Sequence, residues 1–187
     1  DVFPTQSYPF EPFAYFDIDE LMYEIEYNIS LDTYNNLISF YALPEVKNVS
    51  IVMEGITSNL NTVTGESYSV QYNEDSMYPW MGSLVDLEVT SGYWVNMSGP
   101  DTLRGSGYPL NLNQNYALHY GANLISFPSP GSISLDAAIS DEAMENIIAI
   151  IGQGIAVVNN NGTFQGALTS FEGNRGYWVV SNTDFDF

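Results

Sequence analysis

Two short motifs occur twice in this chain at a nearly constant distance. Residues 36–40 read NLISF and return at residues 123–127, 87 positions later, while residues 92–95 read GYWV and return at residues 176–179, 84 positions later. Further matches at these distances are Gly65 with Gly152, Val70 with Val157, Gly82 with Gly166, Leu84 with Leu168, and Glu88 with Glu172. The three-residue change in distance must fall in a loop, because a slip within a buried strand would turn its side chains to the other face. The pattern predicts two tandem, pseudo-symmetric copies of one module.

Each copy carries a similar series of short apolar stretches separated by turn residues. Alternating Val, Ile, Tyr and Trp favour strands, which we expect at residues 27–31, 37–43, 68–72, 80–84 and 92–97, and again at 116–120, 123–127, 154–158 and 177–180. Helical spacing predicts a short helix near residues 49–56 and a longer one over residues 135–151, with Ser134 as N-cap and Gly152 after its end. The predicted fold class is α+β and β-rich, with mostly antiparallel strands and one helix in each copy. An all-β fold is the alternative if the first helix is only a turn.

Residues 1–26 belong to neither copy and form an extended, Pro-rich N-terminal arm. Prolines disfavour helix and favour an extended path. A dense set of aromatic side chains would not be left in water without a partner. We therefore expect an assembly arm that docks on the protein itself or on a neighbour, through Phe3, Tyr8, Phe10, Phe13, Tyr15 and Phe16. Gly and Pro in residues 97–107 predict a linker, which places module 1 at residues 27–103 and module 2 at residues 104–187.

The charge balance limits the partners. The chain has 23 acidic residues against three Lys and Arg, for a net charge of −20, so its surface repels nucleic acid and anionic membranes and attracts cations. The abundance of Asn, Ser, Thr, Tyr and Gly is typical of secreted and cell-surface proteins. There is no Cys for a disulfide, and no apolar run reaches the roughly 20 residues of a membrane-spanning helix. The first residue is Asp rather than Met, which predicts a processed or cut end.

No group of residues has the pattern of an active site. His119 is the only histidine and lies in an expected strand, so we expect a structural or surface role. Only Glu88 and Glu172 repeat among the acidic residues, and each precedes a GYWV motif, where it would hold the turn. Trp94 and Trp178 are expected to anchor the cores, because large aromatic side chains dominate cores. The sequence predicts no catalytic residues and therefore a protein that is not an enzyme.

Two kinds of binding residue remain. Asp17, Asp19 and Glu20 form a short acidic cluster with oxygen ligands of the kind that Ca²⁺ prefers, although a solvated acidic face explains the same residues. We expect no required cofactor, with Ca²⁺ as the candidate ion. Sugars stack on exposed aromatic rings, and the candidate glycan contacts are Tyr78, Trp80 and Tyr108.

The repeated motifs resemble a family of secreted modules that carry an NLISFP…G-x-L…E-x-x-x-GYWV unit, often in tandem, in extracellular and surface-anchored proteins of marine bacteria and related environmental sequences. The resemblance covers residues 27–98 and 110–181; the second copy keeps Pro128 after its NLISF motif, whereas the first has Tyr41. Such units occur as accessory and adhesive parts, so the resemblance implies a secreted scaffold and assigns no functional residue. The N-terminal arm lies outside it.

These observations favour a non-enzymatic extracellular structural protein that binds copies of itself, such as a filament, sheath or surface-layer subunit, joined through the N-terminal arm. A carbohydrate-binding or adhesion module, with polysaccharide as its partner, is the alternative. A glycoside hydrolase fragment is a weaker third hypothesis. Because subunits with a charge of −20 repel one another, assembly would need high salt or bridging divalent cations.

Overall fold

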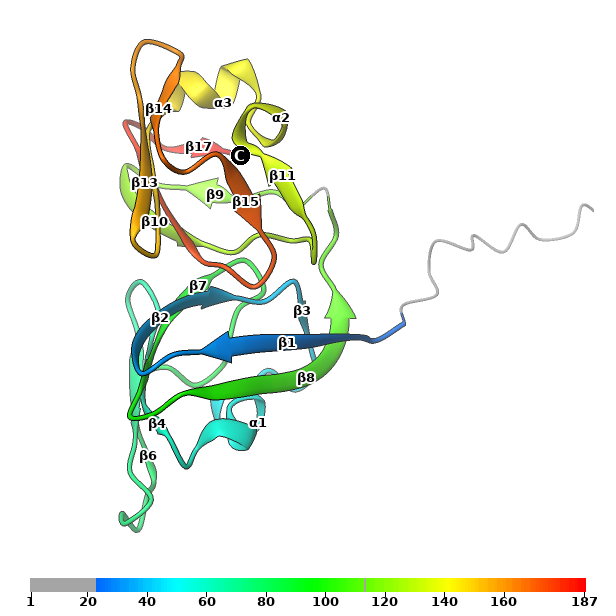
Figure 1. Cartoon of the computed structure of the whole chain (residues 1–187), viewed down its shortest axis with the longest axis vertical. Helices are drawn as coiled ribbons and strands as arrows, with labels where there is room; N and C mark the ends of the chain where they lie inside the picture. Colours follow the sequence, from blue (N-terminus) through cyan, green and yellow to red (C-terminus); the bar gives the residue numbers. More distant parts are fainter. Residues whose placement is uncertain (1–22, 113) are drawn as a thin grey trace, which may run out of the picture.

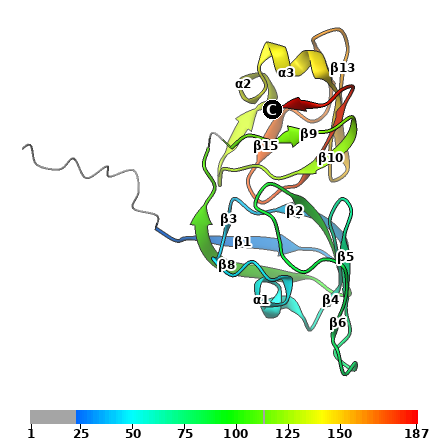
Figure 2. The same cartoon turned by 180° about the vertical axis from the view of Figure 1, so that it is seen from behind.

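The computed structural model describes residues 23–112 and 114–187 of the chain. These residues form antiparallel sheets with a few helical turns, so the expectation of a β-rich fold with mostly antiparallel strands is confirmed. Figure 1 and Figure 2 show two bodies stacked along the long axis of the molecule. We call them the first half, residues 23–109, and the second half, residues 110–187.

The first half contains one large and one small sheet. The large sheet has the order β2-β7-β4-β5-β6 and consists of β2 (Tyr34–Ser39), β7 (Gly92–Met97), β4 (Leu60–Thr64), β5 (Ser69–Tyr72) and β6 (Trp80–Gly82). The small sheet has the order β1-β8-β3 and consists of β1 (Ile25–Leu31), β8 (Asp101–Pro109) and β3 (Ala42–Leu43). One turn of α-helix, α1 (Val49–Val52), and a 3₁₀ turn, η2 (Glu54–Ile56), contribute to the core.

The second half also contains a large five-stranded sheet. Its order is β10-β16-β12-β13-β14, and it consists of β10 (Gly121–Ile125), β16 (Tyr177–Ser181), β12 (Ile147–Gly152), β13 (Ile155–Asn159) and β14 (Phe164–Gly166). Two short ladders accompany it: β9 (Ala117–Leu118) pairs with β17 (Phe185–Asp186), and β11 (Ser132–Ser134) pairs with β15 (Ser170–Glu172). The helices are α2 (Leu135–Ala138) and α3 (Asp141–Asn146).

The two large sheets have the same strand order along the chain and share local contacts. The side-chain amides of Asn36 and Asn123 each donate to three backbone carbonyls and accept from the N–H four residues earlier. The hydroxyls of Tyr93 and Tyr177 each accept from the N–H of the Glu five residues earlier, at 2.6 and 2.8 Å. Repeated residues thus hold corresponding turns in both halves. Glu88 and Glu172 use their backbone rather than their carboxylates in these hydrogen bonds.

The inner face of each large sheet carries the tyrosine and valine of its GYWV motif. Tyr93 and Tyr177 are buried, as is the valine two residues after each. Trp94 and Trp178 are only half-buried and point to the outer face, because neighbouring residues of a strand point to opposite sides. The expectation that the tryptophans anchor the cores is therefore wrong. Tyrosine takes the inner position, where its ring packs in the core and its hydroxyl holds the turn.

The long helix expected over residues 135–151 is also wrong. The chain forms α2 and α3 and then enters β12 at Ile147. Ser140 breaks the helical run, because its side chain accepts from the N–H of Ala143 and caps α3 instead. The Ile-rich stretch from Ile147 to Ile151 favours a strand, since β-branched side chains fit a pleated sheet.

The glycine-rich segment expected to be a linker is the strand β8. β8 pairs with β1 along the whole length of β1, so the expected module boundary between residues 103 and 104 falls inside a strand. Gly105 and Gly107 allow this close packing: a Cβ at Gly105 would overlap the Tyr27 ring, and one at Gly107 would overlap the backbone of Leu43. The glycines therefore serve close approach between strands rather than flexibility.

The two halves meet through their repeated motifs. Gly176 lies against Ile38, and Gly92 lies against Ile125, so closely that a Cβ would be 2.7 and 2.9 Å from the respective carbonyl oxygens. Around these glycines, Ser39 donates its N–H to the carbonyl of Asn174 at 3.2 Å. In return, the N–H of Ser126 donates to the carbonyl of Thr90 at 3.0 Å. The NLISF segment of each half is therefore hydrogen-bonded to the turn that precedes the GYWV motif of the other half.

Two polar side chains cross this junction from corresponding turns. Gln153 accepts from the N–H of Leu37 at 2.8 Å, and Glu66 accepts from the N–H of Leu124 at 2.8 Å. Glu66 also contacts Nε2 of His119 at 2.6 Å. His119 thus helps to join the two halves, which agrees with the structural role expected for it.

Candidate functional site: an apolar groove in the second half

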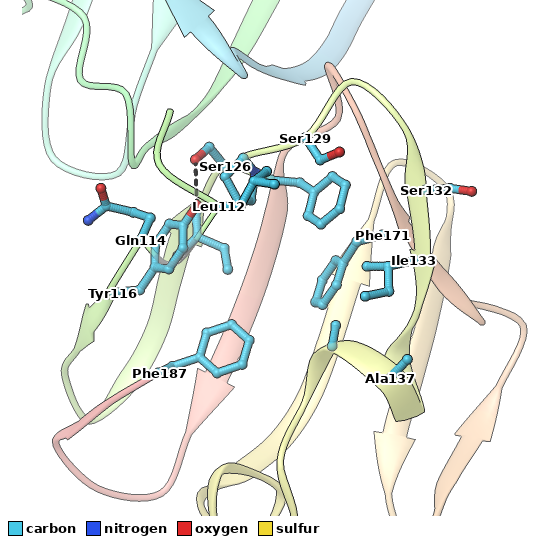
Figure 3. A pocket seen from close by; sticks show the side chains of 14 residues that line it. Leu112, Gln114, Tyr116, Ser126, Ser129, Ser132, Ile133, Ala137, Phe171 and Phe187 are labelled. Carbon is cyan, nitrogen blue, oxygen red and sulfur yellow. Dashed lines mark hydrogen bonds between the residues drawn. The ribbon is translucent and has the colours of Figure 1, made fainter. Parts of the chain in front are cut away.

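An open groove of about 450 Å³ lies in the second half, between the segment before β9 and Phe187 on one side and β11, α2 and β15 on the other. Figure 3 shows Tyr116 and Phe187 on one side of the groove and Phe171 and Ile133 on the other. The lining is mostly apolar, and it contains no charged residue: Leu112, Gln114, Tyr116, Ile125, Ser126, Phe127, Pro128, Ser129, Ser132, Ile133, Ala137, Ala138, Phe171 and Phe187.

The first half has no such groove because β1 and β8 close its core. The two strands pair from Ile25 to Leu31, whereas β9 and β17 pair at Ala117 and Leu118, with two further backbone hydrogen bonds between Tyr116 and Phe187. Tyr27 on β1 packs its ring edge-on against Phe40, with 5.4 Å between the ring centroids. The residue 87 positions after Tyr27, at the corresponding place in the second half, is Gln114. It has no aromatic ring to fill the volume that the Tyr27 ring fills in the first half.

The phenylalanine of the NLISF motif is covered in the first half and accessible in the second. Phe40 is fully buried, while Phe127, its counterpart in the second NLISF motif, is half-buried at the groove. The groove therefore leaves an aromatic ring of the second core accessible to a partner.

Aromatic rings form the floor of the groove. Phe127 stacks on Phe171 with centroids 5.8 Å apart, and Tyr116 lies 6.1 Å from Phe187. The Tyr116 hydroxyl bonds to that of Ser126 at 3.0 Å, and burial raises the pKa of Tyr116, an effect that the bond to Ser126 opposes. At neutral pH the surface is thus uncharged, and it suits a partner that is apolar or aromatic where it touches.

One strand edge borders the groove. β11 contributes Ser132 and Ile133 to the lining, and all three of its residues are exposed. Its ladder with β15 is its one pairing among residues 23–112 and 114–187. A free edge next to an apolar groove offers backbone hydrogen bonds beside side-chain contacts, which is the combination used when a peptide adds to a sheet.

The candidate glycan contacts Tyr78, Trp80 and Tyr108 do not line this groove. The assembly arm and the acidic residues Asp17, Asp19 and Glu20 lie outside the described residues. Of the glycan candidates, Tyr78 is exposed and lies in the connection between β5 and β6. Trp80, on β6, packs on Tyr72 of β5 with 4.9 Å between the ring centroids. Tyr108 lies in a different sheet, on β8.

Comparison of the two halves position by position could have found the groove from the sequence. The replacement of Tyr27 by Gln114 marks a gap near Phe127. Reading the repeat only for what it conserves missed these residues, because the signal lies in what the second half lacks.

Within the part of the chain that the structure describes, no three His, Asp or Glu side chains gather as a metal site would require. Asp184, from an acidic pair near the end of the chain, accepts from the N–H of Tyr120 at 2.7 Å. No helix among the described residues is long and apolar enough to cross a membrane.

No protein-family model matches this chain, and neither a curated protein nor a solved structure matches it. What the protein does must therefore be inferred from its own residues.

Proposed function

We propose that this protein is a non-enzymatic, extracellular structural subunit whose molecules join when the N-terminal arm of one enters the groove of the next. The observation that carries the proposal is the aromatic groove beside Phe127, whose counterpart in the first half, Phe40, is fully buried. Residues 2–10 of the arm are long enough to fill it, carry no charge and include Phe3, Tyr8 and Phe10.

We further propose that the two halves are duplicated copies of one module. The shared strand order, the matching Asn36 and Asn123 networks and the matching Tyr93 and Tyr177 hydroxyl bonds support a common origin. In this view the first module closes its core with its own strands, and the second receives a strand from a neighbour. The motif resemblance to secreted surface modules agrees with an extracellular location.

Joining an arm to a groove gives assemblies that grow. The arm and the groove are different surfaces, so each molecule uses one and still offers the other, and contacts of this kind propagate into filaments unless a ring closes. Molecules with a charge of −20 repel one another. We therefore expect assembly to require salt, whose screening length falls to about 3–4 Å near seawater strength, or divalent cations such as Ca²⁺ that bridge carboxylates.

The proposal is tested on the full chain by negative-stain electron microscopy and sedimentation velocity in seawater-like salt with Ca²⁺. An arm variant, Phe3→Asp with Phe10→Asp, and a groove variant, Ile133→Asp, should each be unable to polymerise. Val85→Asp, at an exposed position of the first half, is the matched control and should assemble normally. Regular polymers from both the arm and the groove variants would refute the proposal.

Mixing the two variants distinguishes docking between molecules from docking within one. The groove variant has an intact arm, and the arm variant has an intact groove, so an equal mixture should form a complex between the two variants. If arms dock only within their own molecule, no arm–groove complex between the variants forms.

A carbohydrate-binding or adhesion module is the second candidate, because aromatic side chains gather beside the β5–β6 hairpin. Tyr78 is 73% exposed and follows Met77, which is also exposed. The rings of Tyr72 and Trp80, on the two strands of the hairpin, pack against each other. Tryptophan quenching by added polysaccharides, lost in Tyr78→Ala and kept in the arm variant, would support this function in place of assembly.

A further inference from the structure

The outer face of the second large sheet is apolar, and carboxylates approach it at one end, where Ile148 shares a hollow with Asp141 and Glu145. The helices α2 and α3 supply residues to the core on the inner side, and among the described residues no element covers the outer side. The side chains on this face are exposed or half-buried and come from four neighbouring strands: Ala122, Ile148, Ala149, Ile151, Ala156, Val158, Trp178 and Val180. We call this surface the aliphatic face.

The first large sheet has polar residues at the same positions of the same strands. They are Asn35, Asn61, Thr62, Thr64, Ser69, Gln71 and Asn96, with Trp94 as the shared tryptophan. Asn61 donates its side-chain amide to Asn96 at 2.8 Å, and Asn96 donates to Asn35 at 2.7 Å, so the amides form a ladder across the strands.

The fold therefore does not require the outer face to be apolar. The first large sheet has the same strand order and carries Asn, Thr, Ser and Gln on its outer face. Exposed fractions of 41% for Ile151 and 52% for Val158 leave much aliphatic surface in water. Contiguous apolar surface of this kind is unfavourable in water and marks an interaction site.

We infer that the aliphatic face packs against the aliphatic face of a second molecule of this chain, about a twofold axis. The residues of the face carry no carboxylate to bind a basic partner, and the −20 surface repels anionic lipid and nucleic acid. A second molecule has the same charge, so this pairing also requires salt that screens the repulsion, and the tests below are made in seawater-like salt. An aliphatic surface with one tryptophan also lacks the aromatic platforms that bind sugars. A partner must present an uncharged apolar surface, and this chain has one.

The shape of the face is self-complementary. Across one row the side chains alternate small and branched, from Ala122 to Val180, Ala149 and Val158. When two such faces pack about 10 Å apart, as sheets do, the valines of one can sit over the alanines of the other. An isologous contact requires this self-complementarity.

The extent of the face agrees with the core of a dimer interface. Four strands about 4.8 Å apart and several rows of residues give a patch roughly 15–20 Å across. A stable interface buries about 800 Å² on each partner and has an apolar core with a polar rim. Figure 1 and Figure 2 show β13 and β14 along the same long side as β4 and β6. The polar face of the first sheet thus lies beyond one end of the patch, outside the proposed contact.

The aliphatic face is separate from the groove, so it does not depend on the proposed function. The groove opens beside α2 and β11, while the aliphatic face lies on the opposite side of the second large sheet from these elements. Arm contacts would link molecules into a chain, and face contacts would pair two such chains.

The first test uses crosslinking, because the chain has no cysteine. Ala149→Cys lies in the middle of the aliphatic face, and Thr62→Cys is the corresponding residue of the polar face. Both are made in the full chain that also carries the arm variant Phe3→Asp with Phe10→Asp. With a short bis-maleimide, Ala149→Cys should give covalent dimers and Thr62→Cys should stay monomeric. Equal dimer yields from the two would overturn the inference.

The second test replaces the face by the residues that the first sheet already uses. Ala149→Thr, Ile151→Thr and Val158→Gln together should weaken the dimer of the arm variant about a hundredfold or more, measured by sedimentation equilibrium. The control is the exposed first-half set Val46→Gln, Ile51→Thr and Val85→Gln, which should leave the dissociation constant unchanged. Circular dichroism reports whether the fold is kept.

The two proposals fail in different ways. If the arm variant still polymerises, the groove proposal is wrong, and the crosslinking result still decides the face. If the arm variant is monomeric at all concentrations and Ala149→Cys gives no crosslink, the inferred pairing of aliphatic faces is wrong. Whether the unmodified chain forms polymers then still tests the docking of the arm in the groove.

Discussion

The first half closes its core with strands that lie outside the repeated motifs, and the second half leaves the corresponding place open. β1 and β8 cover Phe40 completely, while Phe127 is half-buried at the rim of a groove. The large sheet is the same in both, as are the turns before GYWV. The difference teaches that the repeated residues specify the sheet and the junction between the halves, whereas segments next to them decide which core is sealed.

We expect the largest loss of stability from substituting two glycines at corresponding positions of the two large sheets. These substitutions test whether both sheets depend on the same backbone geometry. Gly82 and Gly166 have φ of 157° and 154°, and a Cβ at either would overlap the backbone of the neighbouring strand. Gly82→Ala and Gly166→Ala should each lower the free energy of unfolding by about 3 kcal/mol or more, measured by urea unfolding. Gly55→Ala, where a Cβ meets nothing within 4 Å, is the control. A large loss in one half only would break the structural match between the sheets.

The buried asparagines provide the next comparison. Asn36 and Asn123 are each 4% exposed and hold the turn at the start of their strands through side-chain hydrogen bonds. Asn36→Ala and Asn123→Ala should each destabilise the protein by about 2–3 kcal/mol, because several backbone groups lose their partner at once. Asn61→Ala, on the exposed amide ladder, should cost much less. Thermal or urea unfolding measures all three.

Alkaline pH should reveal a difference between the halves. Burial, and then the nearby Tyr41, raises the pKa of Tyr27 from 10.0 to about 12, while the second half has Gln114 in its place. Unfolded Tyr27 loses its proton near pH 10, so its contribution is complete below that pH and is lost as pH rises to about 12. The loss is about 2 kcal/mol.

Replacement by phenylalanine isolates this contribution. Tyr93, Tyr116 and Tyr177 also have a pKa raised chiefly by burial, so Tyr27→Phe should remove only part of the pH dependence. Denaturant unfolding between about pH 9 and pH 12 measures it. An unchanged slope in Tyr27→Phe would contradict the expected burial effect.

The smallest effect concerns the one ionisable contact across the junction. The hydrogen bond to Glu66, and then that to the Tyr120 carbonyl, raises the pKa of His119 above 6.5, whereas the matching Gln153 has no such pair. The stability that the contact between protonated His119 and Glu66 adds is complete below pH 6.5. This stability is lost as the pH rises through the raised pKa of His119. Because His119 is 57% exposed, the effect on unfolding should be slight. An NMR titration should show the pKa falling towards its usual value in Glu66→Gln.

Sequence reasoning succeeded where a local pattern has one physical solution. The alternation in the GYWV and NLISF stretches gives strands, and the lone histidine has a structural contact. It failed at Ile147–Gly152, where apolar residues on both faces of a strand imitate one side of a helix, and at Trp94 and Trp178, where alternation alone does not say which side faces the core. It also took the glycines of β8 for a linker, because close approach and flexibility use the same residue.

The sequence by itself determined the repeat, the strand-forming segments and the acidic, cysteine-free surface, since each depends on residue type and spacing along the chain. Only the tertiary structure decided which face of each sheet is buried, where the second core opens into a groove, and that the second sheet has an aliphatic face where the first has an amide ladder. These depend on which segments pack together in space. Packing between residues far apart in the chain leaves no periodic signal within any one segment.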